Sequence, residues 1–241
     1  MEKVLISGAN RGLGKGLLAI YLARPNHVVI AANRNPDHPT SKALFDLPTG
    51  EGSKLIVVKV DSGVETDPFD AVNELEKQGV EHLDLVVANA GVAAAFPPVL
   101  EVKRSDLKLH MEANVYGTVS LYQATAGLLR KGTNPRWVTV GSSAGFIVLP
   151  VPNAAYGPAK VAAHWLTKRI DAEEEKIAAF VMHPGWVQTE MGNASAVMIG
   201  YGQAPETIDD SVNGQVKVFD AATKETHGGK MWDFHGELQV W

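Results

Sequence analysis

Short runs of apolar, mostly β-branched residues recur along the chain, separated by polar or amphipathic stretches. The runs lie at residues 3–7, 27–33, 54–60, 83–89, 136–142 and 176–183, and a last one lies within 228–234. Each run is almost continuously apolar, which is typical of strands buried on both faces of a parallel sheet. The pattern therefore predicts a seven-stranded parallel sheet.

Longer segments with helical character lie between these runs. We predict helices over 13–24, 66–79, roughly 105–131 and 156–174, and we expect the proline-containing segment 35–53 to hold a short helix and much loop. The alternation of strand and helix continues from residue 3 to about 183 without a linker or a repeat. It predicts an α/β protein: one doubly wound Rossmann-fold domain over residues 1–241, with right-handed crossovers and helices on both faces of the sheet.

Composition narrows the classes of function. The chain has 241 residues, a net charge of −5 and no cysteine. It offers no positive field for nucleic acid or an anionic membrane, and disulfides, thiolate zinc sites and a cysteine nucleophile are excluded. The N-terminal residues lack the pattern of a signal peptide, and no apolar run reaches the ~18 residues of a membrane span. We expect a cytoplasmic protein without a nucleic-acid or membrane partner.

A glycine-rich turn follows the first predicted strand. Gly8, Gly12 and Gly14 stand in the sequence LISGANRGLGKGL, where the strand leads into the first helix. Glycines let the backbone approach a pyrophosphate, and a helix N-terminus supplies free N–H donors and a favourable dipole. The turn favours a dinucleotide site, although a glycine-rich turn that binds nothing has the same appearance.

The end of the second strand indicates which dinucleotide would bind. An acidic residue there would accept a hydrogen bond from the 2′-hydroxyl of NAD, but this chain has Asn33 followed by Arg34. Arg11, in the glycine loop, adds a second cation. Two guanidinium groups and no carboxylate suit a 2′-phosphate, so we predict NADP(H) as the cofactor.

Tyr156 and Lys160 stand four residues apart at the start of a predicted helix. Residues i and i+4 share one helix face, and Pro158 is tolerated because the first turn has no intrahelical N–H bonds to lose. A nearby ammonium would lower the pKa of the phenol from its ordinary value near ~10. The phenol could then give a proton to a ketone oxygen. A lone Y-x-x-x-K pair is too common to decide the question.

Several further motifs occur in order along the chain. They are SGANRGLG, Asp61 in VDS, NAG at 89–91, Asn114 in HMEANVYGT, SSAG at 142–145, YGPAK and HPGWVQTEM. Together they resemble the short-chain dehydrogenase/reductase family in its single-domain form, over the whole chain. The ending THGGKMWDFHGELQVW also resembles fungal members near norsolorinic acid ketoreductase, which reduce ketones on aromatic polyketides in secondary metabolism.

The resemblance implies roles for four catalytic candidates. Tyr156 would be the general acid in reduction, and Lys160 would lower its pKa and bind the nicotinamide ribose. Ser143, thirteen residues before Tyr156, would bind the substrate carbonyl and donate to the developing oxyanion. We prefer Ser143 to Ser142, because thirteen residues is the spacing that the family requires; consecutive strand side chains also face opposite ways, although this pair sits at the strand end. Asn114 would hold a water in a proton relay to Lys160; without the other motifs, a helix residue facing solvent would be the better interpretation.

The resemblance also implies a cofactor site along the same edge of the sheet. Asp61 would contact the adenine, residues 89–91 would line the adenosine ribose, and residues 184–189 would hold the nicotinamide carboxamide. The predicted cofactor residues are Gly8, Asn10, Arg11, Gly12, Leu13, Gly14, Arg34, Asp61, Asn89, Ala90, Gly91, Tyr156, Lys160, Pro184, Gly185, Val187 and Thr189. The histidines are scattered without H-E-x-x-H spacing, so we expect no catalytic metal.

Three mostly apolar stretches, 92–98, 146–153 and 191–202, should surround the reacting carbonyl. Their candidate contacts are Ala93, Phe96, Phe146, Leu149, Met191, Met198 and Tyr201. None of the three contains arginine or lysine, which favours a hydrophobic or aromatic ketone, although core packing or a subunit contact is the alternative. We expect a mobile substrate lid at about 190–212, and the family resemblance implies a homodimer or homotetramer.

These features predict an NADPH-dependent ketoreductase that makes a secondary alcohol. Two alternatives remain open. A non-catalytic dinucleotide sensor would need neither the serine, the tyrosine nor the lysine. An alcohol dehydrogenase working in the oxidative direction on NAD would be disfavoured by Arg11 and Arg34.

Overall fold

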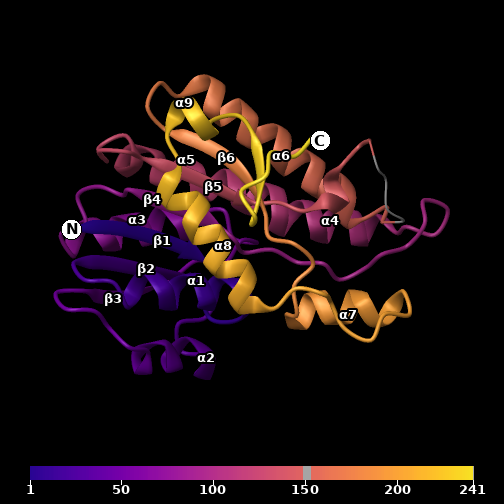
Figure 1. The fold of residues 1–241 in the computed structure, drawn as a ribbon, viewed down its shortest axis with the longest axis horizontal. Coiled ribbons are helices and arrows are strands. Elements are labelled where there is room, and N and C mark those ends of the chain that lie inside the picture. Colours follow the sequence, from indigo (N-terminus) through magenta and orange to yellow (C-terminus); the bar gives the residue numbers. More distant parts are fainter. Residues whose placement is uncertain (149–152, 241) are drawn as a thin grey trace.

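A computed structural model describes residues 1–148 and 153–240 of the chain, and seven strands form its centre. The strands are β1 (Glu2–Ser7), β2 (His27–Asn33), β3 (Lys54–Lys59), β4 (Leu85–Ala88), β5 (Arg136–Val140), β6 (Ala178–His183) and β7 (Met231–Asp233). They are parallel and lie in the order β3-β2-β1-β4-β5-β6-β7 (Figure 1). The order reverses between β1 and β4, and ligands bind beyond the carboxyl ends of strands at such a point.

Helices connect the strands and cover the sheet. They are α1 (Gly12–Leu22), α2 (Pro39–Lys42), α3 (Asp67–Lys77), α4 (Arg104–Met111), α5 (Gly117–Leu129), α6 (Tyr156–Glu173), α7 (Glu190–Met198), α8 (Ile208–Ala221) and α9 (Lys224–His227). Short 3-10 helices span Ala43–Asp46 and Ser143–Gly145. The predicted helices 13–24, 66–79 and 156–174 are confirmed to within two residues. The predicted helix 105–131 consists of α4 and α5, joined by a π-helical turn at Glu112–Tyr116.

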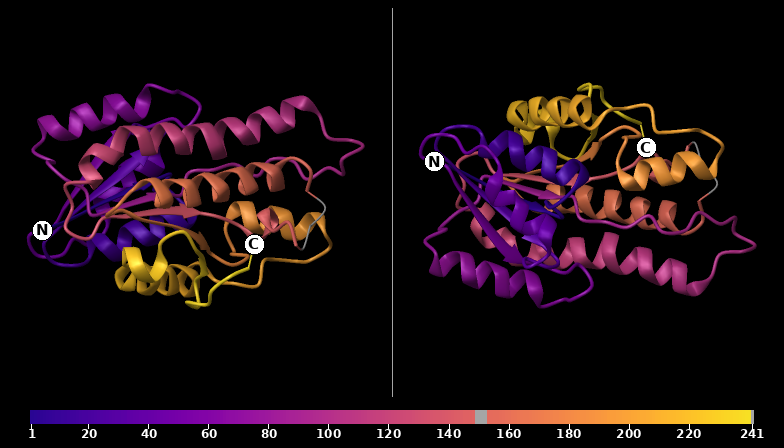
Figure 2. Two further views of the ribbon diagram at one scale, coloured as in Figure 1. Left: turned by 90° about the horizontal axis from the view of Figure 1, so that it is seen from above. Right: turned by 90° about the horizontal axis from the view of Figure 1, so that it is seen from below.

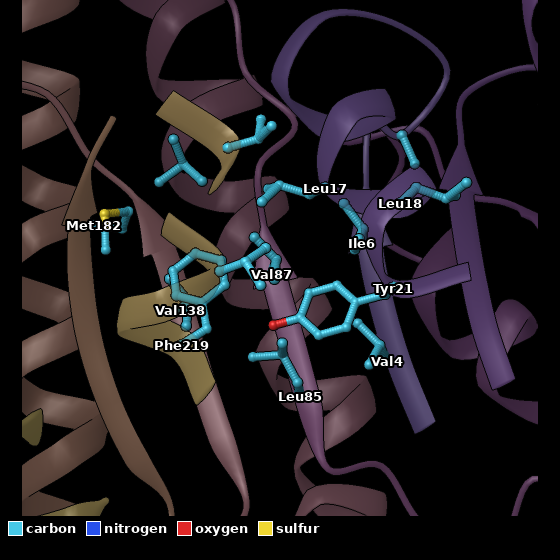
Figure 3. Packing of buried hydrophobic residues seen from close by; sticks show 14 of the residues in the cluster. Val4, Ile6, Leu17, Leu18, Tyr21, Leu85, Val87, Val138, Met182 and Phe219 are labelled. Atoms are coloured by element: carbon cyan, nitrogen blue, oxygen red, sulfur yellow. The ribbon is translucent and has the colours of Figure 1, made fainter. Parts of the chain in front are cut away.

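The sheet separates two hydrophobic clusters, as the near-continuous apolar runs predict. Val4 and Ile6 of β1 point to the side covered by α1 and α8, whereas Leu5 points to the side covered by α3, α5 and α6. Figure 2 shows these helices on opposite sides of the sheet. In Figure 3, Leu17, Leu18 and Tyr21 of α1 meet Val4, Ile6, Leu85 and Val87 of the strands, with Phe219 of α8 beside them. The predicted doubly wound Rossmann fold is confirmed, and its packed layers fix the strand ends on which the candidate site is built.

In the described part of the chain, no helix combines the length and the apolar character that crossing a bilayer requires.

Candidate active site

The glycine loop after β1 forms a backbone cradle. Gly8 has a φ of +64°, and a Cβ atom added to it would lie 3.1 Å from the Cα of Ala90. A Cβ on Gly14 would lie 2.3 Å from the Gly8 carbonyl oxygen. The following helix, α1, begins at Gly12 with no side-chain cap and no acidic residue in its first turn. Free N–H groups beside a close backbone turn fit a pyrophosphate, so these residues can hold the predicted dinucleotide.

The segment after β2 holds this cradle in place. The amide oxygen of Asn33 accepts a hydrogen bond from the Ala9 N–H (2.9 Å), and its Nδ2 donates to Ser41 (3.2 Å). Asn10 donates from its Nδ2 to the hydroxyl of Thr40 (2.7 Å). In the sequence, Asn33 is recognisable only as the residue standing where a carboxylate would be. Its structural role depends on a contact 24 positions away, which no local pattern reveals.

The two arginines that the sequence associates with a 2′-phosphate both lie on the surface. Arg34 directly follows β2 and is exposed. Arg11 is also exposed, and its guanidinium pairs with the carboxylate of Glu190, the first residue of α7. Their contact with a phosphate stays a prediction.

The next two strand ends contribute the remaining candidates for the adenosine side. Asn89 donates from its Nδ2 to the carbonyl oxygens of Ser7 (2.8 Å) and Gly8 (3.2 Å), and so joins the end of β4 to the glycine loop. Gly91 packs closely against Asn114, because an added Cβ would lie 2.9 Å from the Asn114 amide oxygen. Asp61 closes a local turn by accepting from the Gly63 N–H (3.0 Å). Its predicted adenine contact remains untested.

The segment after β6 faces the glycine loop from the other side. The Thr189 Cγ2 lies 3.4 Å from the position of a Cβ on Gly12, and Thr189 caps α7 by accepting from the Gly192 N–H (3.0 Å). Val187 is buried, and the Pro184 carbonyl accepts from the Ser211 hydroxyl (2.6 Å). Gly185 has a φ of +83°. The predicted nicotinamide segment is therefore a fixed turn next to the cradle.

Tyr156 and Lys160 share one face of the first turns of α6, as their spacing predicts. Asn153 closes the start of this helix by accepting from the Tyr156 N–H (2.8 Å), and Pro158 lies within the first turn. The Lys160 Nζ lies 5.5 Å from the centroid of the Tyr156 ring and donates to the Val140 carbonyl (2.7 Å). Both side chains thus meet the carboxyl end of β5.

Burial determines the charge state of this pair. It raises the pKa of Tyr156 to about 12, against a smaller lowering effect of a hydrogen bond with Ser142. It lowers the pKa of Lys160 to about 8. The expected lowering of the tyrosine pKa by an ammonium is therefore wrong for this arrangement. Desolvation of the phenol dominates, and the lysine donates its hydrogen bond to a backbone carbonyl instead.

Ser142 and Ser143 follow the end of β5. The Ser142 hydroxyl accepts from the Ala144 N–H (3.1 Å), and its hydrogen bond with Tyr156 lowers the pKa of the phenol. Ser143 begins the 3-10 helix that follows. The preference for Ser143, which rests on its spacing of thirteen residues from Tyr156, stays a prediction. The strand ends at Val140, and Ser142 is still extended, with a φ of −166° and a ψ of 146°.

A buried histidine of α6 contacts the backbone of the segment that carries Ser142 and Ser143. The Nε2 of His164 accepts from the Ser142 N–H (3.3 Å). Its ring takes the space beside Gly141 and Gly145, where an added Cβ would lie 2.6 Å and 2.7 Å from ring atoms. Burial, followed by the charge of Lys160, lowers the pKa of His164 to about 3. The imidazole is thus neutral near pH 7. The sequence analysis did not single out this residue, since a lone histidine on a helix gives no local signal.

Asn114 lies in the π-helical turn and is buried, so the alternative of a solvent-facing residue is wrong. Its Oδ1 accepts from the Val92 N–H (2.7 Å), and its Nδ2 donates to the Val92 carbonyl (2.9 Å). The side chain therefore anchors the loop after β4. Its predicted relay to Lys160 stays a prediction.

The structure brings some of the predicted substrate residues to the tyrosine and leaves others apart. Phe96 packs edge-on against the Tyr156 ring at 6.3 Å, and Phe146 packs against His183 at 6.2 Å. Tyr201 instead packs on Trp186, with ring centroids 5.7 Å apart. The remaining candidates are Ala93, which is partly buried on the Phe96 loop, Met191 and Met198, which are exposed on α7, and Leu149, which lies outside the described residues.

The predicted lid at 190–212 divides into two parts. Ser211 and Val212 belong to α8 and are buried, whereas Val197, Met198, Ile199 and Tyr201 are more than 60% exposed. In Figure 1, α7 stands apart beyond the carboxyl ends of the strands. We therefore limit the predicted mobile segment to residues 190–207.

We expect this segment to exchange its amide hydrogens faster than α8 in the free protein, because few of its apolar side chains are packed. Exchange is expected to slow when NADPH and a ketone are added together. Mass spectrometry of peptides covering 190–207 and 208–221, with and without both ligands, measures the difference. Equal protection of the two peptides in the free protein would contradict the lid.

Comparison with known proteins shows the family to which the chain belongs. A model of the family described as short chain dehydrogenase matches residues 2–198. A norsolorinic acid ketoreductase of Dothistroma septosporum is 43% identical over 94% of this chain and 87% of its own length. One from Emericella nidulans is 39% identical over 94% of this chain and 88% of its own. The resemblance inferred from the motifs is thereby confirmed.

Solved structures agree on the fold. The NADPH-bound carbonyl reductase from chicken fatty liver is 24% identical, with a TM-score of 0.85 over 100% of this chain and 99% of its own. The carbonyl reductase Sniffer of Drosophila melanogaster is 24% identical, with a TM-score of 0.87 over 100% of both chains. The family model and the relatives that are about 40% identical show that the chain is an oxidoreductase of the short-chain dehydrogenase family.

Proposed function

We propose that this protein is an NADPH-dependent ketoreductase that converts a hydrophobic, aromatic or polyketide-type ketone into a secondary alcohol. The observation that carries the proposal is the Tyr156–Lys160 pair: the lysine Nζ lies 5.5 Å from the phenol ring and donates to the Val140 carbonyl at the carboxyl end of β5, which the serines follow. A protonated phenol with a hydroxyl next to it is suited to a ketone oxygen. Turnover of aromatic and aliphatic ketones with NADPH, with analysis of the products, tests it.

Two side chains would act on the carbonyl oxygen, one as a hydrogen-bond donor and the other as the proton donor. The Ser143 hydroxyl would hold the ketone oxygen and donate to it as negative charge develops. Tyr156 would then give its proton to the same oxygen. With a pKa of about 12, the phenol is protonated near neutral pH, the form in which it can donate a proton to the ketone oxygen. A nicotinamide cofactor, when bound, supplies the hydride. The cradle at Gly8 and Gly14 would bind its pyrophosphate, and Lys160 its ribose.

The proposed cofactor is NADP(H) rather than NAD(H). Support comes from Arg11 and Arg34, two exposed guanidinium groups at the edge of the cradle, and from Asn33 where an acidic residue would favour a free ribose. The alternative of an alcohol dehydrogenase on NAD would be favoured by a preference for NADH. The alternative of a dinucleotide sensor would be favoured by cofactor binding without turnover.

The proposed substrate class rests on the aromatic ring beside Tyr156 and on the relatives. Phe96 contacts the tyrosine ring, and the two relatives above are named norsolorinic acid ketoreductases. Aromatic walls bind flat apolar ketones through stacking and edge contacts. The expected cytoplasmic location and the homodimer or homotetramer stay predictions.

Replacing each serine separately tests which one acts on the carbonyl. We expect Ser143→Ala to lower kcat by about 10²-fold, since removal of one oxyanion donor costs on that order. Ser142→Ala is expected to lower it far less. Steady-state kinetics with one aromatic ketone at saturating NADPH measures both. A larger loss in Ser142→Ala would contradict the assignment based on spacing.

A further inference from the structure

His110, near the end of α4, is a buried histidine that the proposed reaction does not use. It has no exposed surface. Its ring packs edge-on against the ring of Tyr156, with centroids 6.1 Å apart and planes at 66°. The Phe96 ring packs in the same manner on Tyr156, at 6.3 Å and 64°. The tyrosine ring therefore has one aromatic neighbour from α4 and another from the loop after β4.

Both ring nitrogens of His110 are engaged. The Nδ1 lies 2.6 Å from the Asp106 carbonyl oxygen, and the Nε2 accepts from the Ala94 N–H at 3.1 Å. A carbonyl oxygen can only accept and an amide N–H can only donate, so the ring must carry its proton on Nδ1. With no nitrogen left to exchange a proton with a substrate, His110 is not a relay.

The Ala94 contact is one of three that fix the loop 92–98. The Asn114 side chain binds both backbone groups of Val92. At the other end, the Pro97 carbonyl accepts from the Ala154 N–H (3.0 Å), two residues before Tyr156. Between these two ends, His110 binds the backbone of Ala94, which lies between Val92 and Phe96. The loop is thus joined at one end to the π-helical turn and at the other to the start of α6, and the histidine controls the part that carries Ala93 and Phe96.

We propose that His110 is a positioning residue for the substrate: it holds the loop 92–98 so that Phe96 forms an aromatic wall against Tyr156. This inference rests on the proposed ketoreductase function. An aromatic ketone placed against Phe96 would lose affinity when the loop is released, whereas the phenol and the serine would keep their chemistry. The expected effect is therefore on KM for an aromatic ketone more than on kcat.

Two substitutions separate the two ring nitrogens. His110→Gln places an amide oxygen near the position of Nε2 and can still accept from Ala94. His110→Asn ends near the position of Nδ1 and can bind Asp106 but does not reach Ala94. We expect His110→Asn to raise KM for 2-acetylnaphthalene about fivefold to tenfold, the effect of one lost hydrogen bond. The change in kcat and in the NADPH dissociation constant is expected to be smaller, and His110→Gln should restore most of the KM.

Hydrogen exchange gives a readout that does not need turnover. In the protein without ligand, the peptide covering 92–98 is expected to exchange faster in His110→Asn than in wild type, and His110→Gln should again restore protection. If wild type reduces no aromatic ketone, the proposed function fails while this measurement still tests the role of His110. A double-mutant cycle with Phe96→Ala shows whether the histidine acts through the phenylalanine, because the KM effect of His110→Asn should then largely vanish.

Equal behaviour of the Gln and Asn variants would overturn the proposal, as would a loss confined to kcat. If the Asn variant does not fold, the proposal is tested by the tautomer of His110 in the wild-type protein. Nitrogen-15 chemical shifts that show the proton on Nδ1 support it, and a proton on Nε2 overturns it.

Discussion

Tyr156→Phe is expected to lower kcat for ketone reduction by at least about 10²-fold, with the affinity for NADPH nearly unchanged. The phenol is the only group in the proposed site that gives a proton to the ketone oxygen, and general acid catalysis contributes roughly 10²–10⁴-fold. Phenylalanine keeps the ring that packs against Phe96 and His110, so the pocket should keep its shape. Steady-state kinetics and fluorescence titration with NADPH measure the two quantities.

Tyr122→Phe is the matched control for this experiment. Tyr122 lies on α5, where its hydroxyl donates to Glu174 (2.5 Å) and its ring packs on Trp137, on the side of the sheet covered by α3, α5 and α6. It loses the same oxygen atom outside the proposed site, so its kcat should stay close to wild type. Retention of more than about a tenth of kcat in Tyr156→Phe, a loss below ~1.4 kcal/mol, would contradict the proton-transfer role.

Arg34→Asp is expected to reverse a strong preference for NADPH. A 2′-phosphate carries close to two negative charges, and a guanidinium can donate two parallel hydrogen bonds to it. Each such charge-assisted contact contributes on the order of 1.5–3 kcal/mol before solvent screening. We therefore expect wild type to favour NADPH over NADH by at least ~10²-fold in kcat/KM. An aspartate would repel the phosphate and accept from a ribose hydroxyl, so the ratio should invert.

Arg104→Asp controls for the general change in charge. Arg104 is exposed in the first turn of α4, where an aspartate suits the helix dipole. The measurement is kcat/KM for both cofactors on all three proteins at one ionic strength. The phosphate assignment is wrong if wild type uses the two cofactors equally, or if Arg34→Asp leaves the ratio unmoved.

The sequence predicted those parts of the molecule that depend on local patterns. The apolar runs located the strands because a parallel sheet buries both faces of each one. The spacing of Tyr156 and Lys160 placed them on one helix face. The π-helical turn before Gly117 was not predicted, because its apolar pattern differs little from that of a continuous α-helix.

Contacts between distant segments account for what the sequence did not predict at the site. The pKa of Tyr156 depended on its burial by segments from elsewhere in the chain. Asn33, His110 and His164 act through backbone groups between 16 and 24 positions away. A single sequence carries no pattern for such contacts.

The pair between Arg11 and Glu190 gives the proposed phosphate site a competitor within the protein. Both side chains are exposed, so the pair adds little to stability. A phosphate that bound Arg11 through the same nitrogen would displace this carboxylate and not only water. Binding there would be an ion exchange, and the anion that leaves would belong to the first residue of α7. Because thermodynamic linkage is reciprocal, any state of α7 that keeps Glu190 on Arg11 weakens binding of the phosphate by the same factor by which the phosphate weakens that state.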